Sequence, residues 1–187
     1  MLTVLLDAHA DAPAAVNEPG FDALDETGLT RLLDLYQPPA PDWLRINLIV
    51  SVSGSAAGPD GTSESLTNRT DRRILGVIRR QADLVVVGAA SVRAEGYRIP
   101  ATATLGIVTG TGDLAGHRIE ASETARLVVF CPAAAAARVA ETLPGCTVIE
   151  VVDVDGRIDA AELLRAIRAT GARSIVCEGG PSLAAQL

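Results

Sequence analysis

The sequence predicts an α/β fold in which two layers of helices cover a mostly parallel central sheet. Short, continuous apolar runs such as "LVVVG" (84–88) and "ARLVVFC" (125–131) have the composition of strands that are buried on both faces. Segments with apolar residues at helical spacing, such as "DRRILGVIRRQAD" (71–83), separate these runs. Regular alternation of strands and helices is typical of a parallel sheet with helices on both sides.

The predicted elements follow one another from Trp43 onward. Strands are expected at 43–52, 84–88, 104–110, 125–131 and 147–152, and in 173–180, where the strand runs into the glycine turn. Helices are expected at 71–83, 132–143 and 159–171, and a further helix begins at 181. Asn68 or Thr70 is the predicted cap of the first helix, Pro132 occupies a first turn, Asp159 caps the third helix, and Gly171 ends it.

Residues 1–41 precede this pattern and have a looser composition. The segment contains a strand-like apolar start (Leu2–Leu6), one plausible helix (27–36) and the helix-breaking stretch "QPPAPD". A chain of 187 residues favours one domain. We therefore interpret 1–41 as an N-terminal extension that packs on a single domain formed by 42–187.

Composition and charge argue against several classes of protein. The formal net charge of -7 disfavours nucleic acids and anionic membranes as partners, because both require clustered Lys and Arg. The three cysteines are widely spaced without a CxxC pair, and the only histidines are His9 and His117, so no metal site is predicted. Buried thiols suit a reducing compartment. No signal-peptide pattern or membrane-length apolar run occurs, so a cytoplasmic protein is expected.

Ligands of parallel α/β sheets bind at the carboxyl ends of the strands, and four such ends here have unusual sequences. "IVSVSGSAAGPDGTSESLT" (49–67) offers hydroxyl groups, and "VGAASVRAEGY" (87–97) places small residues where a phosphate can approach the backbone. "IVTGTGD" (107–113) and "CEGGPSL" (177–183) run into glycine turns. A solvated loop, tight packing or a simple turn explains each stretch equally well at this point.

Several well-known fingerprints are missing from the sequence. There is no GxGxxG, no GxxxxGK[ST] and no GxSxG, so a standard dinucleotide fingerprint, a P-loop and a serine-hydrolase elbow are not supported. Glu95 and Glu178 are candidate ligand contacts, although a salt bridge or a cap is an equally common role for a single acid.

The order of three blocks is more specific than any one of them. "NLIVSVSGSAAGPDGTS", "DRRILGVIRRQADLVVVGAASVRAEGY" and "IVCEGGPSL" together resemble the reductase domain of bacterial riboflavin biosynthesis, in particular its stand-alone actinobacterial group. The resemblance covers about 43–187. It implies a three-layer αβα, dihydrofolate-reductase-like fold and the NADPH-dependent reduction of 5-amino-6-(5-phosphoribosylamino)uracil to its ribityl product, without a metal. Catalysis in this family is chiefly placement of nicotinamide C4 against the sugar C1 in its imine form, so no catalytic side chain is assigned.

The resemblance also implies roles for individual residues. Substrate contacts fall on Ser63, Arg79, Glu95 and Glu178, with Arg79 as a cationic fork for the phosphate. Without the resemblance, a solvated helix face would be the favoured interpretation of Arg79. Coenzyme contacts fall on Asn47, Val50, Ser65 and Ser91, and on the diphosphate loop formed by Gly179, Gly180, Pro181, Ser182 and Leu183.

The chain departs from the family pattern at several positions. Ser53 replaces the acid of the first motif, Glu95 stands where Asp is frequent, and Gly110 and Thr111 stand where relatives often have Ser or Arg, which leaves the preference for NADPH over NADH open. Relatives continue beyond the glycine pair with a helix and several strands, so the C-terminal part of the domain is expected to be missing and a homodimer is expected of the full fold. A dihydrofolate or pterin reductase on the same fold and a non-catalytic nucleotide-binding relative are the alternatives.

Overall fold

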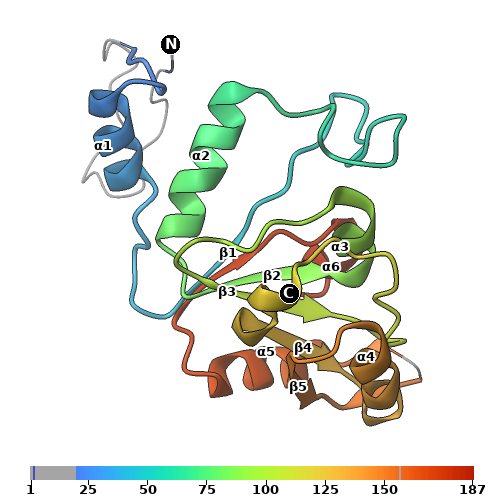
Figure 1. The fold of residues 1–187 in the computed structure, drawn as a ribbon. Coiled ribbons are helices and arrows are strands. Elements are labelled where there is room, and N and C mark those ends of the chain that lie inside the picture. The colour runs from blue at the N-terminus through green and yellow to red at the C-terminus, as the bar shows by residue number, and fades with distance from the viewer. Residues whose placement is uncertain (1, 3–19, 156) are drawn as a thin grey trace.

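Six parallel strands form the central sheet of the protein. The computed structural model describes residue 2 and residues 20–155 and 157–187. The strand order is β1-β8-β2-β3-β4-β5, and a separate antiparallel pair consists of β6 and β7 (Figure 1). The strands are β1 (Trp43–Ile46), β2 (Leu84–Gly88), β3 (Thr104–Val108), β4 (Leu127–Cys131), β5 (Thr147–Glu150), β6 (Asp153–Val154), β7 (Arg157–Ile158) and β8 (Ser174–Cys177).

Helices lie on both faces of this sheet. The α-helices are α1 (Glu26–Leu35), α2 (Arg69–Arg80), α3 (Ala89–Glu95), α4 (Ala136–Thr142), α5 (Ala160–Ala169) and α6 (Pro181–Ala184), and short 3₁₀ helices span Ala121–Arg126 and Ala133–Ala135. Ile78 of α2 and the buried residues of α3 and α4 join one core cluster, and the buried residues of α5 and α6 join the cluster on the opposite face. This arrangement confirms the predicted three-layer α/β fold with a parallel sheet.

The alternation of side chains along a strand explains why both faces are apolar. In β2, Val85 and Val87 belong to the cluster beneath α2 and α3, whereas Leu84 and Val86 belong to the cluster beneath α5. All four side chains are buried. Successive residues of a strand point to opposite faces, so a strand covered on both sides needs an unbroken apolar run. The run "LVVVG" therefore predicted the bounds of β2 correctly.

The predicted helix caps are confirmed at α2 and α5. The Asn68 side chain accepts a hydrogen bond from the Asp71 N–H (3.0 Å), and the Asp159 side chain accepts one from the Glu162 N–H (2.9 Å). Each bond satisfies a backbone donor that has no partner within its helix. Gly171 follows α5 with a φ of +88°, a left-handed conformation that favours glycine.

Several predicted bounds differ from the structure by two or three residues, and two elements differ more. The strand expected at 43–52 ends at Ile46, because its partner β8 ends at Cys177 and the last ladder bond runs from the Asn47 N–H to the Cys177 carbonyl (2.8 Å). The helix expected at 132–143 begins as a 3₁₀ turn after Pro132, which has an extended ψ of 150°, and becomes α-helical only at Ala136. The β6–β7 hairpin was not predicted.

The described part of the N-terminal segment packs on α2. Ala23 and Leu32 form a small core cluster with Val77 of α2, and the Gln81 side-chain amide donates to the Leu33 carbonyl (2.6 Å). Figure 1 shows α1 beside α2. Leu2 pairs with Phe21 in an isolated bridge, and the rest of the expected strand at Leu2–Leu6 lies outside the described residues.

Candidate functional site

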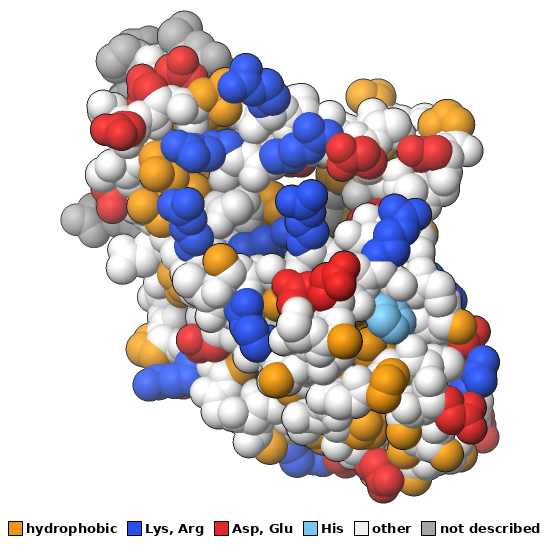
Figure 2. Space-filling view, viewed as in Figure 1, with side chains coloured by type: hydrophobic (Ala, Val, Ile, Leu, Met, Phe, Trp, Pro, Cys, Tyr) orange, Lys and Arg blue, Asp and Glu red, His pale blue; other side chains and the backbone are white. Residues whose placement is uncertain are grey.

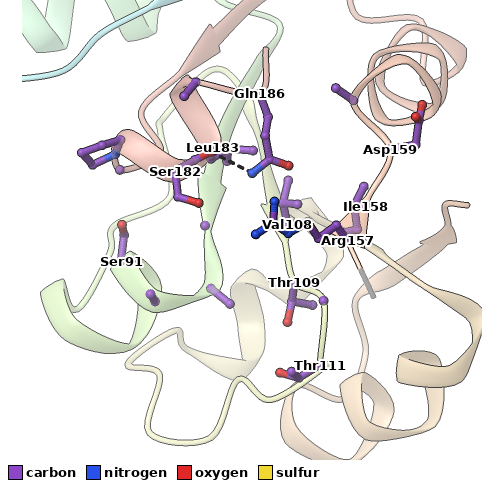
Figure 3. Close-up of a pocket in the computed structure, with 18 of the residues that line it drawn as sticks. Ser91, Val108, Thr109, Thr111, Arg157, Ile158, Asp159, Ser182, Leu183 and Gln186 are labelled. Carbon is purple, nitrogen blue, oxygen red and sulfur yellow. Dashed lines mark hydrogen bonds between the residues drawn. The ribbon is translucent and has the colours of Figure 1, made fainter. Parts of the chain in front are cut away.

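A cleft with a volume of about 910 Å³ opens at the carboxyl ends of β2, β3 and β8. Its lining comes chiefly from four segments: 88–91, 108–111, 157–160 and 180–183. Figure 3 shows these segments converging from the ends of β2 and β3, the start of α6 and the β6–β7 hairpin. Parallel strands end at a common edge, so residues far apart in the sequence meet here, as expected for an α/β sheet.

Small residues leave space in this cleft, and a hydrogen bond fixes the loop that follows β3. A Cβ added to Gly180 would meet no atom within 4 Å, whereas one added to Gly179 would lie 2.6 Å from Leu183 Cδ2. Gly179 therefore allows Leu183 to pack, and it is Gly180 that faces the cleft. The buried Thr109 hydroxyl accepts a hydrogen bond from the Gly112 N–H (3.0 Å), which fixes the loop after β3.

The predicted coenzyme residues divide into two groups. Those that line the cleft are Ser91, Gly180, Pro181, Ser182 and Leu183. Those that do not are Asn47, Val50, Ser65 and Gly179. Asn47 continues the β1–β8 ladder, and Ser65 Oγ occupies the space where a Cβ on Gly58 would lie, inside the loop that precedes α2. The binding roles of both groups stay predictions.

Arg79 and Glu178, two of the predicted substrate contacts, bind each other. Arg79 Nε and Nη2 donate to the two carboxylate oxygens of Glu178, at 2.8 and 2.6 Å. Tyr97 completes the cluster: its hydroxyl accepts from Arg79 Nη2 (2.8 Å) and donates to Glu178 Oε2, and its ring lies 5.0 Å from the guanidinium carbon. The Glu178 side chain is 6% exposed and that of Arg79 is 24% exposed, so the ion pair is largely shielded from water.

Ser63 and Glu95, the other two predicted substrate contacts, also meet. The Ser63 backbone N–H donates to Glu95 Oε1 (3.0 Å), which attaches the polar loop 49–67 to the end of α3. An exposed ion pair between Glu64 and Arg72 attaches the same loop to α2. None of the four predicted substrate residues lines the cleft itself.

The position of the missing family acid lies in a tight turn. Ser53 Oγ is 2.9 Å from Ser51 Oγ, and the Ser51 hydroxyl accepts from the Ser55 N–H (3.0 Å). Gly54 has a φ of +86°. The two serines therefore shape this exposed loop through hydrogen bonds to one another.

Sequence reasoning missed two residues beside the site, Tyr97 and Arg157. Arg157 lies on the β6–β7 hairpin, whose two-residue connection reads Asp-Gly, a turn signal that could have revealed the hairpin. No comparable signal marks Tyr97, because its role depends on a contact with a residue 81 positions away.

Basic residues gather on one side of the site. α2 contains Arg69, Arg72, Arg73, Arg79 and Arg80, and Figure 2 shows arginine side chains over this helix.

Within the described ranges, no group of three or more His, Cys, Asp and Glu side chains could hold a metal ion. In the same part of the chain no helix combines the length and apolarity needed to cross a membrane.

A model of the RibD C-terminal domain family matches residues 42–187. The chain belongs to this family. The match confirms the resemblance to riboflavin-biosynthesis reductases that the three sequence blocks indicated. No match was found among curated protein sequences.

Solved structures share the fold of this RibD C-terminal domain. The chain is similar to a pyrimidine reductase-like protein from Corynebacterium diphtheriae, with 22% identity and a TM-score of 0.63 over 76% of this chain and 67% of that one. It is similar to the deaminase/5-amino-6-(5-phosphoribosylamino)uracil reductase of Thermotoga maritima, with 20% identity and a TM-score of 0.62 over 78% and 41%. A riboflavin biosynthesis reductase of Saccharomyces cerevisiae has 15% identity and a TM-score of 0.61 over 83% and 73%. These likenesses support the dihydrofolate-reductase-like fold, and the chain spans less than half of the Thermotoga protein.

Proposed function

We propose that the protein is a pyrimidine reductase of riboflavin biosynthesis that uses NADPH to reduce 5-amino-6-(5-phosphoribosylamino)uracil. The observation that carries the proposal is the cleft at the carboxyl ends of β2, β3 and β8 in a chain that belongs to the RibD C-terminal domain family. Structural neighbours with this fold include proteins described as pyrimidine and riboflavin biosynthesis reductases.

The cleft has the size and lining that a dinucleotide requires. Its volume of about 910 Å³ lies near the upper end of the usual range for ligand pockets. Ser91 and Ser182 offer hydroxyl groups, and the uncovered backbone at Gly180 allows a diphosphate to approach closely. We assign Ser91 and Gly180–Leu183 to coenzyme binding.

The ion-pair cluster adjoins this cleft along the chain and is the proposed substrate side. Glu178 lies two residues before Gly180, and Tyr97 follows the end of α3, whose first residues line the cleft. Arg79 and the neighbouring arginines of α2 provide positive charge for the ribose phosphate. Because Glu178 already holds Arg79 in a bidentate pair, we propose that the pair orients the guanidinium and that a phosphate competes for it.

The chemistry needs placement more than an activated side chain. When bound, NADPH supplies a hydride to C1 of the open-chain imine, and a proton from water joins the imine nitrogen, giving the ribityl amine and NADP⁺. The proposed role of the chain is to hold both reactants in contact and in a reactive orientation. Tyr97 and Glu178 hold the half-buried Arg79 in one orientation before the substrate phosphate binds.

Steady-state oxidation of NADPH tests the proposal. Protein, NADPH and the phosphoribosylaminouracil substrate should consume NADPH and form the ribityl product, as detected by absorbance and mass spectrometry. Consumption with dihydrofolate and not with the pyrimidine would replace the proposed substrate. Absence of both turnover and coenzyme binding would leave a non-catalytic relative and contradict the proposal.

We also propose that the protein acts as a homodimer in the cytoplasm. The outer edge of β1 has no strand partner among the described residues, and large apolar side chains such as Ile46, Leu48 and Val50 are exposed along the same stretch. An unpaired strand edge with apolar side chains favours association. Light scattering after size-exclusion chromatography should give twice the mass of the 19.3 kDa chain.

A further inference from the structure

We propose that Arg157, on the β6–β7 hairpin, binds the 2′-phosphate of NADPH and makes the cleft select NADPH over NADH. This inference rests on the proposed function and assigns the coenzyme preference to one residue. The loop after β3 begins with Thr109, Gly110 and Thr111 and offers no cation there. The cation comes instead from a hairpin that faces the end of β3 across the cleft.

The hairpin places Arg157 at the cleft by its own local geometry. Val154 pairs with Arg157, so only two residues connect β6 to β7, and Asp155 has a φ of +51°. A left-handed residue in a two-residue connection is typical of the turns that favour tight hairpins. Figure 3 shows the Arg157 side chain extending from the hairpin toward Val108 at the end of β3.

Arg157 is the cation of the cleft lining whose guanidinium has no hydrogen-bond or ion-pair partner among the described residues. The lining contains three charged side chains: Arg93, Arg157 and Asp159. Arg93 donates to the Asp113 carbonyl, and Asp159 caps α5. The guanidinium of Arg157 makes no hydrogen bond or ion pair with another residue in the described part of the chain, and the residue is exposed.

A phosphomonoester, such as the 2′-phosphate of NADPH, suits the guanidinium of Arg157 better than a diphosphate or a carboxylate does. It carries nearly two negative charges near neutral pH, and a guanidinium binds such a group through two parallel hydrogen bonds. Thr109 and Thr111 lie below Arg157 in Figure 3, and their hydroxyl oxygens accept from Gly112 and Asp113, which leaves each O–H free to donate. Since the whole chain has a net charge of -7, a local cation is needed to attract this group.

Calorimetric titration of coenzymes and their fragments tests the proposal. The ligands are NADPH, NADH, adenosine 2′,5′-bisphosphate and adenosine 5′-monophosphate, and the variants are Arg157→Ala and Arg165→Ala. Arg165 is an exposed arginine of α5 that pairs with Glu162 and does not line the cleft, so it controls for a general loss of charge. Arg157→Ala should weaken binding of NADPH and of the bisphosphate about tenfold or more, and leave NADH and the monophosphate unchanged. Arg165→Ala should change none of the four affinities.

The outcomes separate this inference from the proposed function. If the wild-type protein binds NADPH but Arg157→Ala leaves its affinity unchanged, or weakens NADPH and NADH equally, Arg157 does not read the 2′-phosphate and the inference fails alone. If the wild-type protein binds neither coenzyme, the proposed function fails together with the inference. Arg157 is exposed, so an unchanged thermal unfolding midpoint should accompany the expected result.

Discussion

Glu178, Arg79 and Tyr97 form a residue cluster whose members depend on one another. Replacing Glu178 with Ala leaves the guanidinium of Arg79 without its bidentate partner in a mostly buried position. We predict that Glu178→Ala lowers the free energy of unfolding by about 3 kcal/mol, because one partner of a buried pair is lost. Denaturant unfolding measures this change. Glu64→Ala is the matched control, since it breaks an exposed pair with Arg72 that contributes at most about 1 kcal/mol. Equal small losses in both variants would contradict the account.

The three cysteine side chains differ in burial, and this difference predicts the order in which their thiols react. Burial raises the pKa of the Cys131, Cys146 and Cys177 thiols, and Cys131 and Cys177 are fully buried. We predict that iodoacetamide labels the half-buried Cys146 first and the other two only after the chain opens. Because the folded-state pKa lies above the unfolded value, the associated stability is present below about pH 8.5 and is lost as pH rises through the folded-state pKa. Time-resolved mass spectrometry checks the order, and labelling of Cys177 as fast as Cys146 would contradict it.

At the scale of the elements, the packing of β3 against β4 depends on a glycine within β3. A Cβ at Gly106 would lie 3.0 Å from Phe130 Cε2 and 3.5 Å from the methyl groups of Leu84. We predict that Gly106→Ala lowers the free energy of unfolding by about 1–3 kcal/mol through overpacking. Adding Phe130→Leu should recover part of this loss relative to the sum of the single changes. Gly76→Ala, in open space on α2, should instead stabilise by about 0.5–1 kcal/mol. If Gly106→Ala left the free energy of unfolding unchanged, β3 would have relaxed around the added methyl group, and the prediction would be wrong.

The elements differ in how far the sequence determines them. The bounds of β2 and the caps at Asn68 and Asp159 follow from local composition, and all three were predictable. The end of β1 at Ile46 was not, because a strand persists only where a neighbour supplies hydrogen bonds, and β8 ends at Cys177. A strand's length therefore depends on its partner as much as on its own residues.

The site also has features that the local sequence predicts and features that depend on contacts between residues far apart in the chain. The convergence of Ser91 and Gly180–Leu183 in one cleft was predictable, because strand ends of a parallel sheet share an edge. The pairing of Arg79 with Glu178 was not, since the two residues are 99 positions apart and side-chain reach decides the contact. Two residues expected to face a substrate thus face each other in the structure.

At the scale of the whole molecule, the described part of residues 1–41 packs on α2, and we predict that it unfolds together with the sheet. Leu32 of α1 is 1% exposed and packs with Val77 of α2. We predict that Leu32→Ala lowers the free energy of unfolding by about 2–5 kcal/mol while the protein still unfolds in one transition. Leu24→Ala, at an exposed position, should have little effect. A separate early transition, with the main one unchanged, would show that the extension is an independent unit.

We propose above all that the cleft at the carboxyl ends of β2, β3 and β8 binds a nicotinamide coenzyme. Ala90 is exposed and lines this cleft, so Ala90→Trp fills part of it without entering the core. The most direct measurement is a calorimetric titration of NADPH into the wild-type protein and Ala90→Trp, with circular dichroism to verify that both are folded. We predict saturable binding of one NADPH per wild-type chain and at least about tenfold weaker binding to Ala90→Trp. Equal affinity of the two folded proteins, or no binding by the wild type, would contradict it.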